Sequence, residues 1–173
     1  MTESTLHVPG ESTPASPSPA RRSRAVWWFA VPAVSGVMLG VLWWVLAPGG
    51  LNVISGNPEL GDPANPDTWL PRDLVLAALM LVSGCATGLL LDGKLQGEGA
   101  GIRLASAVAG GGVGAVIAWV VGLQAAQFWG AASDPAYGFS LRSYAVLFLW
   151  PGAIAFLTFV LALFGVLSHK PVK

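Results

Sequence analysis

Four long stretches of the chain contain no Asp, Glu, Lys, Arg or His, and shorter segments that carry charges separate them. The uncharged stretches cover residues 25–47, 74–91, 104–123 and 144–167. A mostly apolar run of about 18 residues or more is long enough to cross the hydrocarbon core of a bilayer as an α-helix. The pattern therefore predicts an all-α fold, a four-helix transmembrane bundle whose main solvent is lipid.

The composition leaves little material for anything else. Only 10% of the 173 residues are charged, against about 25% in soluble domains. We expect a disordered cytoplasmic tail at 1–24, which is rich in Ser, Thr and Pro and cannot bury enough apolar surface to order itself. A four-span membrane domain at 25–168 and a short basic cytoplasmic tail at 169–173 complete the predicted organisation.

The basic residues predict how the spans are oriented. Seven of the nine fall on one side of the four spans and two on the other. Lys and Arg accumulate in cytoplasmic flanks of membrane proteins. We therefore expect both termini and the 92–103 loop in the cytoplasm, and the loops at 48–73 and 124–143 outside. The predicted location is the cytoplasmic (inner) membrane of the cell, with multiple passes. The seven are Arg21, Arg22, Arg24, Lys94, Arg103, Lys170 and Lys173, and the two are Arg72 and Arg142.

Aromatic residues gather at the predicted outer ends of the spans. Such rings suit the headgroup level, where one edge is apolar and the other wet, so we interpret them as an interface belt. They are Trp43, Trp44, Trp69, Phe128, Trp129, Tyr137, Phe139 and Tyr144.

Three spans carry two glycines four positions apart. Residues with this spacing share one helix face, and the missing side chains let another backbone approach closely. We predict that these positions form the helix-packing seams within one bundle. Contacts between two copies of the chain through the same stripes are the alternative. The positions are Gly36 and Gly40, Gly84 and Gly88, and Gly110 and Gly114.

Two prolines lie inside the predicted spans. Proline removes a backbone donor and clashes with the preceding turn. Pro32 should therefore bend or restart the first span near its inner end, and Pro151 should kink the fourth. Kinks of this kind occur at gates in transport proteins and also in inert bundles, and the sequence leaves both interpretations open.

The two halves of the chain resemble each other. Residues 33–36 with Gly40 match residues 107–110 with Gly114 at an offset of 74. An Asp-Pro-Ala segment follows in each outer loop, at 62–64 and at 134–136, and an arginine then precedes each next span. This order favours two tandem two-helix units related by an axis along the membrane normal. Chance similarity between small apolar segments is the alternative.

Chemistry-bearing residues are scarce at the predicted membrane depth. No span has an ionisable carboxylate, amine or imidazole in its middle, where ion pathways and substrate sites usually show one. The lone cysteine, Cys85, cannot form an intrachain disulfide. We therefore expect no enzyme, no catalytic residues, no cofactor and no metal. The zero net charge also argues against a nucleic-acid partner.

Charged residues in the outer loops offer one further possibility. Asp73 beside Arg72 should anchor the outer end of the second span, because a carboxylate is favoured at a helix N-terminus. Asp134 and Arg142 could bridge within their own loop. If the loops converged, the outer carboxylates could gather a divalent cation, although exposed carboxylates are usually only solvated. These carboxylates are Glu59, Asp62, Asp67, Asp73 and Asp134.

The segment Trp43-Trp44-Val45-Leu46-Ala47-Pro48 closes the first span. With the Arg-rich tail and four spans, residues 25–167 resemble small four-span membrane proteins of high-GC Gram-positive bacteria, a family of unknown function. The resemblance implies that the Trp-rich turn leads into an outer loop and that an acidic residue, Asp73 here, opens the second span. That family often places Gly after the acid, whereas this chain has Leu74. The resemblance implies no activity, cofactor or partner.

These observations give two hypotheses for the function. The first is a non-enzymatic membrane protein that serves as a structural or accessory partner in a cell-envelope complex. The alternative is a small transporter or channel subunit that acts as an oligomer. The expected partners are the lipid bilayer and either other membrane proteins or further copies of this chain.

Overall fold

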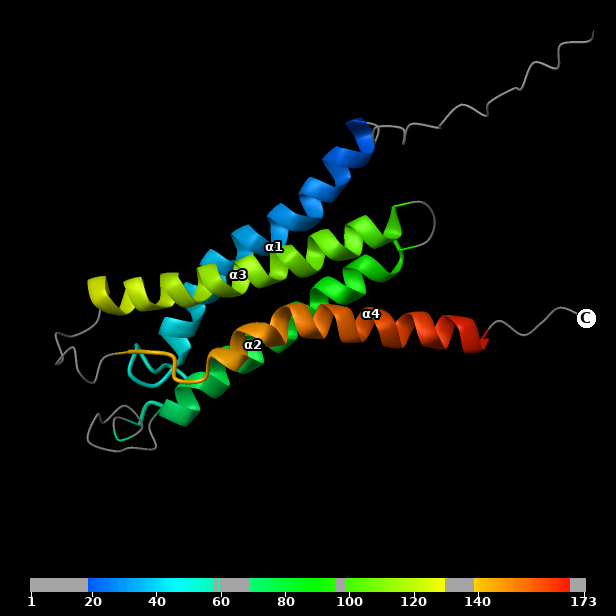
Figure 1. Cartoon of the computed structure of the whole chain (residues 1–173). Helices are drawn as coiled ribbons and strands as arrows, with labels where there is room; N and C mark the ends of the chain where they lie inside the picture. Colours follow the sequence, from blue (N-terminus) through cyan, green and yellow to red (C-terminus); the bar gives the residue numbers. More distant parts are fainter. Residues whose placement is uncertain (1–18, 58, 60–68, 96–98, 130–138, 169–173) are drawn as a thin grey trace, which may run out of the picture.

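The structure is a computed structural model that describes residues 19–57, 59, 69–95, 99–129 and 139–168. It contains four α-helices, and the short 3-10 helix η3 leads directly into the last of them (Figure 1). The described part of the chain has no strand, so the predicted all-α fold is confirmed. The elements are α1 (Pro19–Leu46), α2 (Trp69–Asp92), α3 (Ala100–Trp129), η3 (Tyr144–Phe148) and α4 (Leu149–Ser168).

Each predicted span corresponds to a helix that is long and apolar enough to cross a membrane. The four stretches are Ala25–Leu46, Trp69–Asp92, Ala100–Trp129 and Tyr144–Leu167. These four helices are those of a multi-pass membrane protein by their length and composition. Some helices exceed the predicted bounds: α2 begins five residues before residue 74, and α3 extends beyond 104–123 at both ends.

The helix α1 also begins before the predicted span. It starts at Pro19, so the last residues of the segment 1–24, which we expected to be disordered, are helical. Residues 1–18 and 169–173, the rest of the two predicted tails, lie outside the described residues.

The helices alternate in direction, so the bundle has two chemically different ends. At the aromatic end, α1 and α3 finish and α2 and η3–α4 begin; at the basic end, α1 starts, α2 leads into α3, and α4 finishes (Figure 1). The first and last described residues, Pro19 and Ser168, therefore lie at the same end, as an even number of spans requires. The side of the membrane that each end faces stays a prediction.

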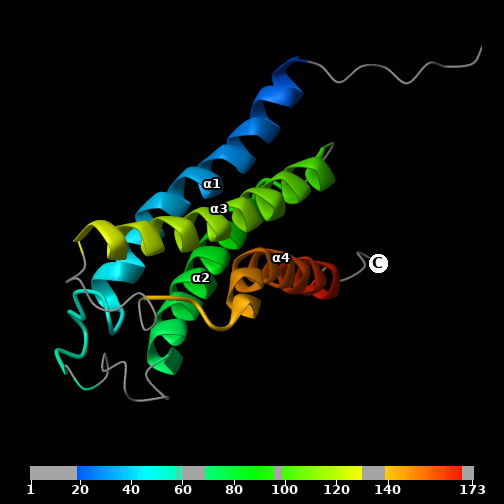
Figure 2. The ribbon, with the colours of Figure 1, turned by 60° about the vertical axis from the view of Figure 1, so that its left-hand side comes forward.

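The helices α1 and α3 pack side by side, α2 packs beside α4, and α3 also contacts α4 (Figures 1 and 2). Direct contact between α1 and α2 is slight. Corresponding helices of the two sequence halves are thus neighbours, and each half makes most of its contacts with the other half. Two tandem units, if they arose by duplication, interlock rather than form separate hairpins.

Glycines allow the backbones of α1 and α3 to approach closely. A methyl group at Gly114 would lie 2.5 Å from the Pro32 carbonyl oxygen, and one at Gly40 would lie 2.5 Å from the Ala118 carbonyl oxygen. Gly36 faces Gly114 itself. The offset from Gly36 to Gly114 is 78, one helical turn beyond the offset of 74 in the sequence repeat. A twofold axis would place positions of α1 and α3 that differ by 74 at the same height. The contact between Gly36 and Gly114 does not obey that symmetry.

The second seam joins α2 to the first turns of α4. A methyl group at Gly84 would lie 2.6 Å from the Ala153 Cβ and 2.7 Å from the Trp150 carbonyl oxygen, and one at Gly88 would meet Leu157. Gly110, the remaining glycine of the predicted stripes, faces the backbone of Phe29. Helix association in lipid relies on close packing of this kind, because no water-driven force acts there.

Large apolar side chains fill the space between the two seams. Trp150 is 1% exposed, and its indole ring faces α3, where a methyl group at Gly114 would lie 3.0 Å from the ring and one at Gly111 3.2 Å from it. Gly114 is thus held between Pro32 and Trp150. The largest fully buried side chains are Trp43, Trp150, Leu76, Met80, Leu91 and Ile154.

The two prolines occupy different contexts. The helix α1 continues through Pro32 without a break, so it does not restart there. Pro151 is the third residue of α4, directly after the 3-10 helix η3. Pro151 therefore lies where 3-10 geometry changes to α geometry, and a kink of the fourth span at this residue stays a prediction.

Candidate functional site

Arg72 and Asp73 are both buried, although they carry opposite charges and were expected at the mouth of an outer loop. Arg72 is 6% exposed and Asp73 is 3% exposed. They lie in the first turns of α2, which begins at Trp69. A buried charge is costly unless it is paired and hydrogen-bonded. Their surroundings therefore determine whether this part of the aromatic end is stable.

The guanidinium of Arg72 organises the loop that follows α1. Its Nε–H donates a hydrogen bond of 3.0 Å to the Pro48 carbonyl oxygen. Gly49 has a φ of +83°, which favours glycine, and a methyl group there would lie 2.6 Å from Nη2 of Arg72. The guanidinium also lies 5.1 Å from the ring centre of Phe139, a favourable distance for a cation–π contact.

Trp43 connects the end of α1 to the same cluster. Its Nε1–H donates a hydrogen bond of 3.0 Å to the Arg72 carbonyl oxygen, and its ring lies 4.4 Å from that of Phe139. Trp43 is 0% exposed and Trp44 is 7% exposed. The interpretation of these two residues as an interface belt was therefore wrong, because their rings pack inside the protein. Trp129 is exposed, and its ring centre lies 5.8 Å from that of Trp44.

Asp73 connects α2 to the segment that starts the fourth span. Its Oδ2 accepts backbone N–H bonds from Ser143 at 2.7 Å and from Arg142 at 3.2 Å. Ser143 is the residue before η3, and its own side chain makes no capping bond in the described structure. Asp73 thus accepts, from another helix, the N–H of the residue before η3, a donor that a Glu or Gln at the third helical position accepts in a capping box. Within the described residues, Oδ1 of Asp73 has no hydrogen-bond partner.

We name Trp43, Arg72, Asp73, Phe139 and Ser143 the aromatic-end cluster. It joins the end of α1, the start of α2 and the segment before η3 through hydrogen bonds and ring contacts. Hydrogen bonds to charged groups contribute about 1.5–3 kcal/mol each. The cluster can therefore hold the loops in one arrangement.

The other predicted outer-loop residues do not join this cluster through described side-chain bonds. Asp62 and Asp134 lie outside the described residues, so the predicted bridge from Asp134 to Arg142 and the predicted cation site stay predictions. Arg142 is exposed and donates its backbone N–H to Asp73, and its positive charge also acts on Arg72 and Asp73. Among the residues that the structure describes, no group of three His, Cys, Asp or Glu could hold a metal ion.

Adjacency in the sequence identified Arg72 and Asp73 as a pair, but it missed their partners. Ser143 carried a weak signal, because it directly follows Arg142, the second-half counterpart of Arg72. Nothing in the sequence identified Trp43 or Phe139 as neighbours of the pair. Comparison with protein-family models, curated proteins and solved structures gives no match for the chain. The resemblance to small four-span proteins of high-GC Gram-positive bacteria therefore stays a prediction.

Proposed function

We propose that this protein is a non-enzymatic integral membrane protein that serves as a structural or accessory partner in a cell-envelope complex. Its termini lie in the cytoplasm in this proposal, and its aromatic end faces outward. The observation that carries the proposal is the filled centre of the bundle, where Trp150 packs between the two glycine seams.

A filled, uncharged centre supports a scaffold rather than a carrier. Paths for ions or polar solutes through membrane proteins are usually lined by polar or ionisable groups. In α2, the charged side chains are confined to Arg72 and Asp73 at one end and Asp92 at the other. Between them, the buried positions Leu76, Met80, Gly84 and Gly88 offer no such lining.

The aromatic-end cluster supports a role in presenting a surface to a partner. A loop that only connects two spans needs no buried ion and no bond from a distant helix. Here Arg72 binds the loop after α1, and Asp73 binds the segment before η3. The cluster thereby holds chain segments from both outer loops in place, which is what a partner that recognises the outer face would require.

The experiment is purification of the tagged protein in mild detergent after crosslinking in living cells. We expect the same envelope proteins to accompany the wild type and Asp92→Ala, an exposed carboxylate at the opposite end of α2. Asp73→Ala should lose them, while size-exclusion chromatography shows that the bundle persists. Recovery of the wild type without any partner in repeated purifications would contradict the proposal.

The transporter or channel alternative predicts a different outcome. The half-repeat and Pro151 favour it at the level of sequence, and its path would have to form between copies of the chain. Purified protein in liposomes should then pass ions or small solutes. A flux that exceeds empty liposomes and depends on the protein would support this alternative over the scaffold.

A further inference from the structure

The loop that follows α1 folds back onto the end of that helix. The Leu51 N–H donates a hydrogen bond of 3.1 Å to the Trp44 carbonyl oxygen, and the Val53 N–H donates one of 3.2 Å to the Val45 carbonyl oxygen. One further turn of helix would normally supply these two donors, but that turn would include Pro48, which has no N–H. The loop supplies the donors instead and therefore stays beside the end of α1.

Polar groups of the same loop are bonded to one another. The Gly56 N–H donates a hydrogen bond of 3.0 Å to the Asn52 carbonyl oxygen. The Asn52 side-chain amide donates one of 2.9 Å to the Asn57 carbonyl oxygen, and the Ser55 hydroxyl donates to Oδ1 of Asn52. An unpaired backbone group is costly near lipid, where water cannot replace the missing partner. Internal bonds of this kind allow an irregular loop to approach a bilayer.

Three apolar side chains of the loop are exposed. Leu51, Val53 and Ile54 each keep more than half of their surface accessible; we name them the loop patch. Exposed apolar patches mark surfaces that contact another molecule or a membrane. The loop thus has its polar groups bonded within the protein and branched aliphatic side chains on its outside.

Trp44 relates the loop patch to the level at which α3 ends. Its carbonyl oxygen accepts the N–H of Leu51, and its ring centre lies 5.8 Å from that of Trp129. Trp129 is the last residue of α3 and is exposed. Exposed tryptophan at the end of a membrane span suits the headgroup level. The loop patch therefore begins beside a residue that marks this level.

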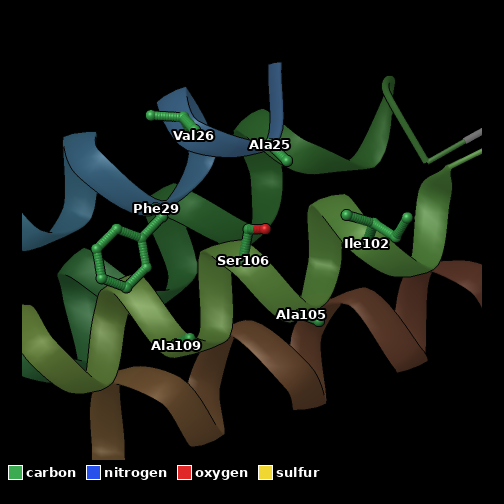
Figure 3. A pocket seen from close by; sticks show the side chains of 7 residues that line it. All are labelled: Ala25, Val26, Phe29, Ile102, Ala105, Ser106 and Ala109. Carbon is green, nitrogen blue, oxygen red and sulfur yellow. The ribbon is translucent and has the colours of Figure 1, made fainter. Parts of the chain in front are cut away.

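The two ends of α1 differ in where charged residues begin. At the basic end, α1 and α3 border an apolar groove whose lining includes Ala25 and Ile102 (Figure 3). In the sequence, Arg24 directly precedes Ala25, and Arg103 directly follows Ile102. Beyond the other end of α1, the first charged residue is Glu59. The uncharged stretch that forms the first span therefore continues past the helix and includes the whole loop patch.

We propose that the loop patch inserts into the bilayer leaflet at the aromatic end and anchors the end of α1 there. Apolar side chains of interfacial segments are buried about 5–10 Å into the boundary between headgroups and acyl chains. Trp43 and Trp44 cannot provide this anchor, because their rings pack inside the protein. The exposed polar residue Ser55 then returns the chain to water. Part of a loop that the sequence places outside the membrane is thus in contact with lipid.

Fluorescence quenching of the full-length protein in nanodiscs of phosphatidylcholine and phosphatidylglycerol tests this proposal. Val53→Cys, in a Cys85→Ala background, carries a bimane label. A phospholipid with a nitroxide on its acyl chain reports contact with lipid, and iodide reports contact with water. We expect the nitroxide lipid to quench the label at least about twofold more strongly than iodide does. Leu51→Cys should give the same result.

Two further positions calibrate the two quenchers. Val34 is exposed within α1, so a label on Val34→Cys should be quenched by the nitroxide lipid. Glu59 is exposed beyond the loop patch, so a label on Glu59→Cys should be quenched by iodide.

A charge within the loop patch should remove it from the lipid. Ile54→Asp should lower quenching of the Val53→Cys label by the nitroxide lipid at least about twofold, because an ionised carboxylate is costly in an apolar medium. Glu59→Gln, a charge change at a nearby exposed position, should leave this quenching unchanged. Thermal unfolding verifies that each variant is folded, which we expect because Ile54 is exposed.

Three results would overturn the proposal. Quenching by iodide that equals or exceeds quenching by the lipid, at either Leu51→Cys or Val53→Cys, would place the patch in water. Protection of both labels from both quenchers would place it against protein, and a disulfide between two Val53→Cys chains would then identify a second copy as the partner. Unchanged lipid quenching in Ile54→Asp would show that the patch does not hold the loop in the bilayer.

Discussion

The Asp73 carboxylate accepts the backbone N–H of Ser143 at 2.7 Å, so the start of α2 is bonded to the residue that precedes η3. Seventy positions separate the two residues, the same offset that relates Arg72 to Arg142 in the sequence repeat. The acid of the first half therefore binds the backbone at the corresponding place in the second half. This bond fixes where the fourth span begins.

Replacement of Asp73 by Ala should destabilise the protein by about 3 kcal/mol, because two backbone donors and the Arg72 guanidinium lose a buried acceptor or counter-charge. Asp92→Ala, at an exposed position of the same helix, should change stability by less than about 0.5 kcal/mol. Thermal and denaturant unfolding in detergent measure both. Equal losses of stability in the two variants would mean that the hydrogen bonds of Asp73 do not stabilise the protein.

Gly114 should tolerate no side chain. Gly114→Ala places a methyl group 2.5 Å from the Pro32 carbonyl oxygen and 3.0 Å from the Trp150 ring, so α1 and α3 must separate. We expect a loss of about 1–3 kcal/mol. Gly112→Ala, in the same helix with nothing within 4 Å of the added methyl group, should be neutral or stabilising by up to about 1 kcal/mol. A Gly114→Ala protein as stable as Gly112→Ala would contradict the close α1–α3 contact.

Trp150 should be the side chain whose truncation costs most in the bundle. Trp150→Ala leaves a cavity between α2, α3 and α4 and should cost about 3–5 kcal/mol. Trp27→Ala removes the same group from a position that is 67% exposed and should cost less than about 1 kcal/mol. The midpoints of thermal unfolding of the two variants, measured in the same detergent, test this difference. Similar midpoints would show that the centre of the bundle is not tightly filled.

Periodicity and charge predicted the four spans well, because a bilayer demands a long uncharged helix for each crossing. Their limits were less accurate, since α2 takes Arg72 and Asp73 into its first turns. A prediction that ends each span at its first charged residue assigns Arg72 and Asp73 to the preceding loop. The structure keeps them in the helix because Pro48, Ser143 and the Phe139 ring provide partners that lie far away in the sequence.

The sequence could not predict which helices are neighbours. The stripes at Gly36, Gly84 and Gly114 each indicate a close contact, but a glycine specifies only that some backbone approaches. Which backbone approaches depends on the large residues that must fill the remaining space, as Trp150 does beside Gly111 and Gly114. The burial of Trp43 could not be predicted either, because an aromatic residue at the end of a span suits both the lipid headgroups and a protein interior.

The direction of the bundle in the membrane is open to a direct chemical test. Ser55, in the loop after α1, and Gly93, just after α2, are both exposed, and α2 lies between them in the chain. Each can be replaced by Cys in a Cys85→Ala background, which removes the native thiol. A membrane-impermeant maleimide added to intact cells then reports the side on which each position lies.

We predict that Ser55→Cys is labelled on intact cells and that Gly93→Cys is labelled only after the membrane is permeabilised. Labelling of both positions from the same side of an intact membrane would contradict the claim that α2 crosses the bilayer, and with it the four-span bundle.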